Sequence, residues 1–262
     1  MLVLHHADTS VCSQKVRMML ALLGLDYESV LLSLPRGDQF RPEYLKLNPD
    51  AVVPTLVDDG LVVVESSLIL DYLDREHNGG RLTPPDRAGR VRAQHWLLRC
   101  LNIHAAINTL TFSTANRAVL RARLSPAEID ALAAKFPDPV MGNKRRDLIL
   151  NGLDSPYVDQ ALMYLRRMLV DLQAQLTGDW LGGDAPNIID VALVAYVDRL
   201  DRLGFDGFWA EYPAVAPWLA RWRATDAYAA AIEAFIPANS AAPMRAAGAE
   251  HWPALLQRWT AP

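Results

Sequence analysis

Hydrophobic positions in the first eighty residues alternate between strand spacing and helix spacing. Short apolar runs predict four strands, over residues 2–4, 27–32, 55–57 and 61–64. Apolar residues three or four positions apart predict two helices, over residues 11–23 and 66–76, and residues 41–47 are expected to form a short helix or turn. Gly24 ends the first helix. The helix at 66–76 is expected to turn its apolar side chains inward: Leu68, Ile69, Tyr72 and Leu73.

The last two strands predict a hairpin, because Asp58-Asp59-Gly60 lies between them. Asp-Gly tolerates the positive φ angles that a tight hairpin turn requires. The resulting order, β-α-β-α-β-β-α, is typical of a thioredoxin-like domain. The segment 78–86 is rich in Gly and Pro and predicts a linker.

No strand pattern recurs after residue 86, so residues 87–262 are expected to be all helical. Ser125 and Glu128 have the spacing of a capping box. Asn187 and Asp190 open another helix in a similar way. Near the end of the chain, apolar side chains at helical spacing predict a short docked helix: Trp252, Leu255, Leu256 and Trp259. The fold class is therefore α+β, with a thioredoxin-like domain at 1–77 and an all-helical domain at 87–262.

Composition restricts the function classes. The 262 residues suffice for two domains and a large core, and the net charge of −4 gives no reason to expect nucleic-acid binding. Cys12 and Cys100 lie in different predicted domains, so a disulfide framework is not expected and a reducing cytoplasm fits better. We also expect no signal peptide and no membrane span, since no apolar run of about 18 residues occurs.

Three short motifs in the first third of the chain describe one small site. Ser10-Val-Cys-Ser13 opens the first helix, Val53-Pro54 precedes a strand and Glu65-Ser66 opens the third helix. A hydroxyl or thiol at a helix N-terminus favours an anion. The residue before a proline is extended and can offer its backbone groups to a ligand. Together these motifs suit a small peptide thiol that carries an amine and carboxylates.

These motifs resemble those of the glutathione transferase superfamily. Residues 10–17 are similar to the first loop and helix of zeta-like members, and residues 48–56 to the segment with the family's cis-proline. Glu65-Ser66 matches the γ-glutamyl-binding pair, and residues 187–190 are similar to the capping box of a buried helix. The resemblance implies glutathione as co-substrate, a small hydrophobic electrophile and a homodimer. No metal is expected, because no cluster of residues looks like a metal site and the two cysteines are far apart in sequence.

The thiol-activating residue has three candidates. Ser10 corresponds to the serine of zeta-like members, whereas Ser13 corresponds to a serine of β-etherase-like members. Cys12, at a helix N-terminus, is expected to have enhanced thiol reactivity. Any of the three can instead serve as a cap or a packing residue.

The remaining site residues follow from the resemblance. Val53 and a cis-Pro54 would pair with the cysteinyl backbone of glutathione, Ser66 with its γ-glutamyl carboxylate and Glu65 with its ammonium. Gln39 is a candidate for the glycyl carboxylate, and an exposed loop glutamine without a role is the alternative.

The leading expectation for function is a glutathione S-transferase that attacks an apolar, aromatic electrophile. The first loop and residues 51–57 also look like those of chlorohydroquinone reductive dehalogenases, and residues 124–152 look like lignin β-etherases. Dehalogenation and ether cleavage are therefore alternatives. A Cys12-dependent thiol reductase and a non-catalytic glutathione-binding protein form another class. The electrophile pocket is expected from residues 103–112 and 157–164, with Trp252 and Trp259; core packing is the alternative. Whether residues 238–262 cover the site stays open.

Overall fold

A computed structural model describes residues 1–260 of the chain. Four strands come first: β1 (Leu2–His6), β2 (Glu28–Leu31), β3 (Thr55–Asp58) and β4 (Leu61–Val64). They form one mixed sheet in the order β2-β1-β3-β4, in which only β1 and β2 are parallel. The helices between and after them are α1 (Val11–Leu23), α2 (Pro42–Leu45) and α3 (Ser66–Asn78), with short 3-10 turns η1 (Leu34–Arg36) and η2 (Asp38–Phe40). The predicted order of elements is therefore confirmed.

Local conformations follow the predicted turn chemistry. Gly24 ends α1 at a φ of 64°, and the turn between β3 and β4 has positive φ at both Asp59 and Gly60. One prediction was wrong: the Leu68 side chain is 54% exposed, whereas Leu70 is fully buried. The buried stripe of α3 runs through Ser66, Ile69, Leu70, Leu73 and Asp74. The stripe is rotated because Leu70, not Leu68, completes the helical spacing with Ser66 and Leu73.

The rest of the described chain is helical. Ten helices follow: α4 (Arg87–Ser113), α5 (Ala115–Arg123), α6 (Pro126–Ala133), α7 (Pro139–Asn151), α8 (Tyr157–Gln175), α9 (Ile188–Arg202), α10 (Val215–Arg223), α11 (Asp226–Ala231), α12 (Ala241–Ala249) and α13 (Trp252–Trp259), with 3-10 turns η3 (Gly152–Asp154), η4 (Asp206–Trp209) and η5 (Glu233–Phe235). The capping box of Ser125 and Glu128 is present at the start of α6. The α+β class is thereby confirmed.

The chain divides into two compact units. The first comprises residues 1–101, 172–197 and 214–236, and the second comprises residues 102–171, 198–213 and those from 237 onward. Three limits of these units fall within α4, α8 and α9, and the other two fall between η4 and α10 and after η5. The boundary expected at 78–86 stays a prediction. Within residues 1–260, no helix combines the length and the hydropathy that crossing a membrane requires.

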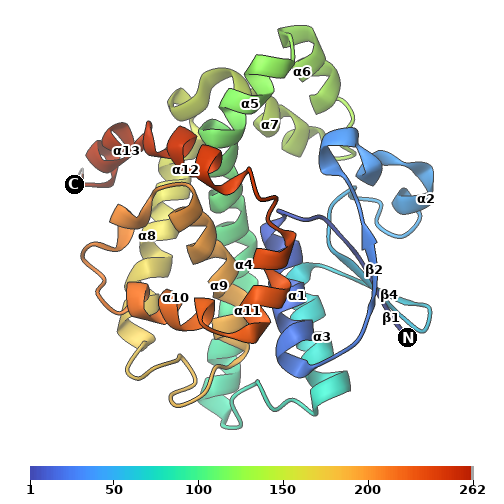
Figure 1. The fold of residues 1–262 in the computed structure, drawn as a ribbon, viewed down its shortest axis with the longest axis vertical. Coiled ribbons are helices and arrows are strands. Elements are labelled where there is room, and N and C mark those ends of the chain that lie inside the picture. The colour runs from blue at the N-terminus through green and yellow to red at the C-terminus, as the bar shows by residue number, and fades with distance from the viewer. Residues whose placement is uncertain (261–262) are drawn as a thin grey trace. The chain divides into compact units, whose positions relative to one another are not determined.

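The first unit packs helices against the sheet. α1 and α3 cover one face of the sheet, and α2 lies toward the other (Figure 1). Every residue of α1 from Val11 to Leu20 is buried, so this helix is enclosed on all sides. Its Arg17 donates hydrogen bonds to the carbonyls of Ala231 (2.7 Å) and Asp8 (2.8 Å), and its guanidinium lies 4.0 Å from the centre of the Phe235 ring. A buried cation thus ties α1 to its neighbours through carbonyl acceptors.

His6 in β1 is held neutral by this arrangement. Its side chain is fully buried, with Nδ1 2.9 Å from Arg17 Nη1 and Nε2 2.7 Å from Ser29 Oγ. Because a guanidinium only donates, Nδ1 must accept and Nε2 must carry the proton. Burial, then the charge of Arg17, lowers the pKa of His6 to about 4.

We expect the free energy of unfolding to fall as the pH drops from about 6.5 toward 4. The folded pKa lies below the unfolded value near 6.5, so only the unfolded chain takes up a proton at His6 in this window. Urea unfolding at pH 7 and pH 5 measures the decrease in the free energy of unfolding. The decrease should be smaller in His6→Gln, which lacks the contribution of His6. His95→Gln, at an exposed position of α4, is the matched control and should keep the full pH dependence.

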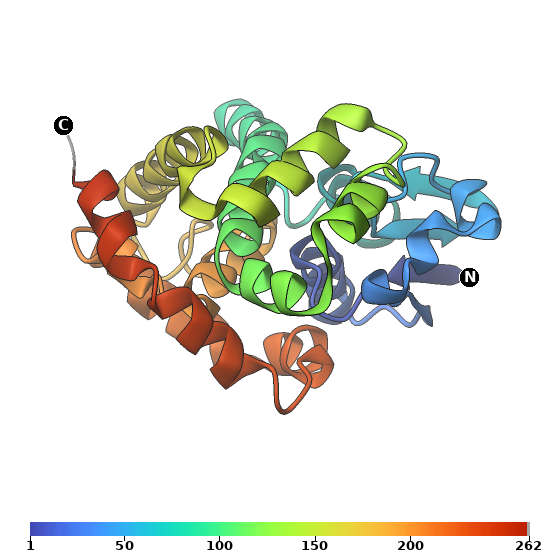
Figure 2. The same cartoon turned by 90° about the horizontal axis from the view of Figure 1, so that it is seen from above.

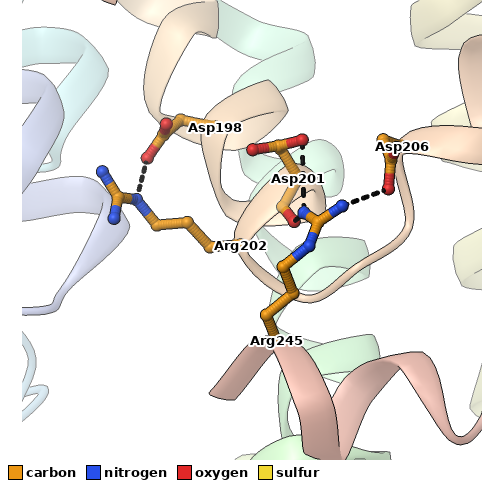
Figure 3. A network of polar contacts seen from close by, with 5 residues as sticks. All are labelled: Asp198, Asp201, Arg202, Asp206 and Arg245. Atoms are coloured by element: carbon orange, nitrogen blue, oxygen red, sulfur yellow. Dashed lines mark hydrogen bonds and ion pairs between the residues drawn. The ribbon is translucent and has the colours of Figure 1, made fainter. Parts of the chain in front are cut away.

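The second unit holds the C-terminal helices in place with polar and aromatic contacts. In this unit, α7 packs against α5 and α6, and α12 packs against α5 (Figure 2). Arg245 of α12 bonds to the Asp201 carbonyl and to Asp206 Oδ1 (2.9 Å), beside the Asp198–Arg202 pair of α9 at 2.6 Å (Figure 3). The predicted docked helix is present as α13. Its Trp259 is buried 4.4 Å from the Phe208 ring, and Trp252 lies 5.0 Å from that ring.

Gly248 of α12 lies close to the backbone of Leu203 in the second unit. A Cβ at this position would lie 2.1 Å from the Leu203 carbonyl oxygen, a backbone atom that cannot swing aside. We expect Gly248→Ala to displace α12 and to cost about 1–3 kcal/mol, the usual cost of overpacking. Limited proteolysis should then cleave the segment after residue 237 faster. Ala246→Ser, on the exposed side of α12, should leave the cleavage rate unchanged.

Candidate functional site

The sheet brings the three predicted motifs to one of its ends. His5 of β1 pairs with Thr55 of β3, and Thr55 pairs with Val64 of β4. The loop before Ser10, the Val53-Pro54 peptide and Glu65-Ser66 therefore all adjoin this end. β2 runs parallel to β1 and ends there as well, so the turns that carry Gln39 follow from the same edge. Residues far apart in sequence thus gather in one place of the first unit.

Ser10 is the N-cap of α1. Its backbone is extended, and its Oγ accepts a hydrogen bond from the Ser13 N–H at 3.3 Å. The side chain is half-buried. The hydroxyl therefore lies at the positive end of a helix dipole and retains a proton that it can donate to an anion.

The two rivals of Ser10 are more deeply enclosed. Ser13 is fully buried, and its Oγ accepts a hydrogen bond from the Ala7 N–H at 3.2 Å. Cys12 is 9% exposed, and neither Cys12 nor Cys100 forms a disulfide. The Ser13 hydroxyl thus braces the loop between β1 and α1.

Sequence reasoning missed a buried lysine that joins two parts of the site. Lys15 Nζ in α1 donates to Ser67 Oγ at 2.8 Å, at the start of α3, and lies 3.4 Å from the Tyr196 hydroxyl of α9. Lys15 has no exposed surface. Its cation therefore links the helix that Ser10 caps to the helix that Glu65-Ser66 opens. The sequence offered one sign of this lysine, its position among the apolar residues of the first helix. Nothing in the sequence indicated that Ser67 and Tyr196 are its partners.

The Val53-Pro54 peptide bond is cis, as the resemblance implied. The loop before it is braced, because Asn48 Nδ2 donates to the Val52 carbonyl (3.0 Å) and to Thr55 Oγ1 (3.1 Å). The Tyr44 hydroxyl also bonds to Thr55 Oγ1 at 2.9 Å. Among the described residues, no hydrogen bond engages the backbone of Val53. Its N–H and C=O remain available to an extended peptide.

Glu65 has an unusual backbone for a residue with a side chain. Its φ is 69°, a conformation that costs on the order of 1–3 kcal/mol and tends to persist where function requires it. The Glu65 side chain is exposed and makes no cap to α3, whereas Ser66 is buried at the first position of that helix. An exposed carboxylate thus precedes helix N–H groups that can bind a carboxylate.

Two buried glutamines carry amide atoms with no partner in the described part of the chain. Gln39 in η2 is 8% exposed with an unpaired Oε1, and Gln14 in α1 is 1% exposed with both amide atoms unpaired. Unsatisfied buried amides are rare because each costs free energy. Gln14 was not singled out from the sequence. Across residues 1–260, no group of three His, Cys, Asp or Glu side chains is placed to hold a metal ion.

Two family models match the chain. The glutathione S-transferase N-terminal domain matches residues 4–81, and the glutathione S-transferase C-terminal domain matches residues 155–221. Among relatives, the chain is 30% identical to a maleylacetoacetate isomerase of Pseudomonas aeruginosa over 202 residues, 74% of this chain and 79% of that protein. It is 37% identical to the glutathione S-transferase Z1 of Arabidopsis thaliana over 106 residues, 39% of this chain. That match and the one to a zeta-class enzyme of Euphorbia esula span only 48% and 34% of those relatives.

Solved structures add two similar proteins. The β-etherase LigF of a Sphingobium strain superposes with a TM-score of 0.78 at 25% identity, covering 89% of this chain and 99% of that one. A glutathione transferase of Burkholderia graminis, solved with two glutathione molecules bound per subunit, has a TM-score of 0.65 at 27% identity and covers 91% of this chain and 89% of that one. The paired domain models and the long bacterial match show that the chain belongs to the glutathione transferase superfamily.

Proposed function

We propose that the chain binds glutathione at the end of its sheet and directs the thiolate at an electrophilic carbon of an apolar, aromatic substrate. The observation that carries this proposal is the gathering of Ser10, the cis Val53-Pro54 peptide and Glu65-Ser66 at one sheet end. Each of these features suits a different part of the tripeptide. Their separation along the chain makes a chance gathering a poor explanation.

Each residue has a role that its geometry supports. The Val53 backbone pairs with the cysteinyl residue, because its N–H and C=O are not engaged elsewhere in residues 1–260. The first N–H groups of α3 and the Ser66 hydroxyl bind the γ-glutamyl carboxylate. The exposed Glu65 pairs with the ammonium, and Gln39 binds the glycyl carboxylate.

Ser10 is our candidate for thiol activation. A thiol becomes a good nucleophile only as the thiolate, and a hydrogen bond donated to sulfur stabilises that form. Ser10 is half-buried at the N-terminus of α1, whereas Ser13 is fully enclosed. The α1 dipole adds a partial positive charge at the same place. Ser13→Ala and Cys12→Ser test the two alternatives.

The thiolate forms a C–S bond, and the leaving group departs with the electron pair of the bond that breaks. With a halogenated aromatic the leaving group is the halide. With an aryl ether it is a phenolate, and the structural similarity to a β-etherase favours this as a second candidate. Several relatives are maleylacetoacetate isomerases. In an isomerisation the same thiolate adds to a conjugated double bond and later leaves, so glutathione is not consumed.

Titration calorimetry with glutathione and with S-methylglutathione tests the binding proposal. We expect saturable heat with both ligands and, for Glu65→Gln, at least tenfold weaker binding, because a charge-assisted contact to the ammonium is lost. Asp59→Asn, an exposed carboxylate at the other end of the sheet, is the matched control. A folded protein that gives no heat with either ligand would refute the proposal.

A substrate panel then separates the chemistries. Halide release from a chloronitrobenzene, phenolate release from an aryl ether and the loss of free thiol are measured in parallel. Isomerase activity would change a conjugated substrate without loss of thiol. For the thiol-reductase alternative, Cys12→Ser should abolish any reduction of a mixed disulfide and leave conjugation intact. We further propose a cytoplasmic homodimer, which sedimentation analysis checks for assembly.

A further inference from the structure

The second unit contains a cavity of about 90 Å³, lined largely by residues of α4 and α8 that were expected to form the electrophile pocket. Three alanines, Ala105 and Ala106 of α4 and Ala161 of α8, leave the space open by their small size. Tyr157 and Tyr164 of α8 also line it; they are seven residues apart and therefore lie on one side of that helix. Both rings are half-buried. The cavity thus combines a narrow space with two aromatic walls.

A cation reaches this cavity from α7. Lys144 is one of its lining residues, and its Nζ lies 5.0 Å from the centre of the Tyr157 ring. The lysine is half-buried, and burial, together with the charge of Arg145, lowers its pKa. Within residues 1–260, no carboxylate forms an ion pair with Lys144. This ammonium is partly removed from water without a counter-charge.

The two arginines that follow Lys144 on α7 differ in whether they pair with a carboxylate. Arg146, on the exposed side of α7, pairs with Asp130. The Arg145 guanidinium instead stacks 3.3 Å from the centre of the Phe112 ring, and its Nη2 donates a hydrogen bond to Asn108 Oδ1 at 3.4 Å. Burial lowers the pKa of Arg145 as well. Two adjacent cations in the described structure therefore create a positive potential that an anion would offset.

We propose that this cavity is a binding site for a small aromatic carboxylate, with the carboxylate paired to Lys144 and the ring in contact with Tyr157 and Tyr164. The size of the cavity limits the ring. About 10–15 Å³ admits one water, and an engineered cavity of about 150 Å³ accepts benzene, so a single ring that enters partway is the largest group that fits. The proposal rests on the proposed function, because it names a ligand class for the expected electrophile pocket; benzoate binding and glutathione binding are measured separately, so either can fail alone.

Titration with benzoate, followed by calorimetry, tests the site. Benzamide has the same ring without the charge, and cyclohexanecarboxylate has the charge without the aromatic ring; both should bind several-fold more weakly. Lys144→Met should weaken benzoate about tenfold or more, the usual effect of losing a hydrogen bond to a charged group. Lys135→Met removes an exposed lysine of the same unit and should leave the affinity unchanged.

A cavity-filling variant ties the binding to this location. Ala105→Leu places a larger side chain in the space from a half-buried position, where α4 is expected to tolerate it, and should abolish benzoate binding. Circular dichroism and glutathione affinity confirm that each variant is folded. The proposal is overturned if folded wild-type protein shows no saturable benzoate binding, or if Lys144→Met and Ala105→Leu bind benzoate as the wild type does.

Discussion

Replacing Asp190 with alanine is expected to lower the free energy of unfolding by about 4 kcal/mol, the largest effect on stability that we predict. Asp190 is fully buried near the start of α9. Its Oδ1 accepts hydrogen bonds from the Leu181 N–H (3.0 Å) and from Trp218 Nε1 (2.8 Å), and its Oδ2 accepts one from the Asn187 N–H (2.9 Å). Alanine leaves three donors without an acceptor, two of them buried and the Leu181 N–H partly buried. Each orphaned donor costs about 1–3 kcal/mol before the structure relaxes.

Urea unfolding of matched variants measures this effect. Asp184→Ala removes an exposed carboxylate from the loop before α9 and should change stability by less than about 0.5 kcal/mol. Asn187→Ala removes only the helix cap, whose Oδ1 accepts from the Ile189 and Asp190 N–H groups, and should cost about 1 kcal/mol. A loss at Asp190 no larger than that at Asn187 would contradict the argument, since the bonds to Trp218 and Leu181 would then contribute nothing.

The elements of the first eighty residues could be predicted because their signals are local. The Asp59-Gly60 turn and the Gly24 helix end depend on backbone conformations that few residues adopt, and the sequence shows them directly. The same holds for Asn187 and Asp190, where a cap and its return hydrogen bond are three residues apart. Such features need no knowledge of tertiary contacts.

Features that depend on tertiary packing were not visible in the sequence. Leu68 and Leu70 are both leucines on α3, and only the packing partners of this helix decide which one is buried. The apolar spacing of α1 predicted one buried face, yet Lys15 and Arg17 are enclosed too, because Ser67, Tyr196 and the Ala231 carbonyl receive their hydrogen bonds. These acceptors lie 52 to 214 residues away along the chain.

The candidate site lies between these two cases. Its motifs are short and local, so each could be recognised, and the sheet register explains why they meet. The sequence left Ser10, Cys12 and Ser13 as rivals because all three lie within one turn of the same helix end. Burial separates them, with Ser13 fully enclosed and Ser10 partly open. Ser10 therefore carries the sharpest functional prediction.

We expect Ser10→Ala to lower kcat/KM for glutathione conjugation about 10- to 100-fold. The variant removes the hydroxyl that donates to the thiolate, and a hydrogen bond to a charged group contributes about 1.5–3 kcal/mol. The pKa of bound glutathione, followed by thiolate absorbance against pH, should rise by about 1–2 units for the same reason. Ser10 also caps α1 through the Ser13 N–H, so a loss of about 1 kcal/mol in stability should accompany the change.

Three variants distinguish activation from a loss of structure. Ser10→Thr retains a hydroxyl at the cap and should keep most of the activity. Ser10→Gly retains much of the capping preference but no hydroxyl, so it should be nearly as stable as the wild type and as inactive as Ser10→Ala. Ser13→Ala loses only the bond from the Ala7 N–H and should leave the pKa of bound glutathione unchanged. If Ser13→Ala raised that pKa while Ser10→Gly did not, the sulfur would lie at Ser13 instead, and the enclosed hydroxyl would have to become accessible when glutathione binds.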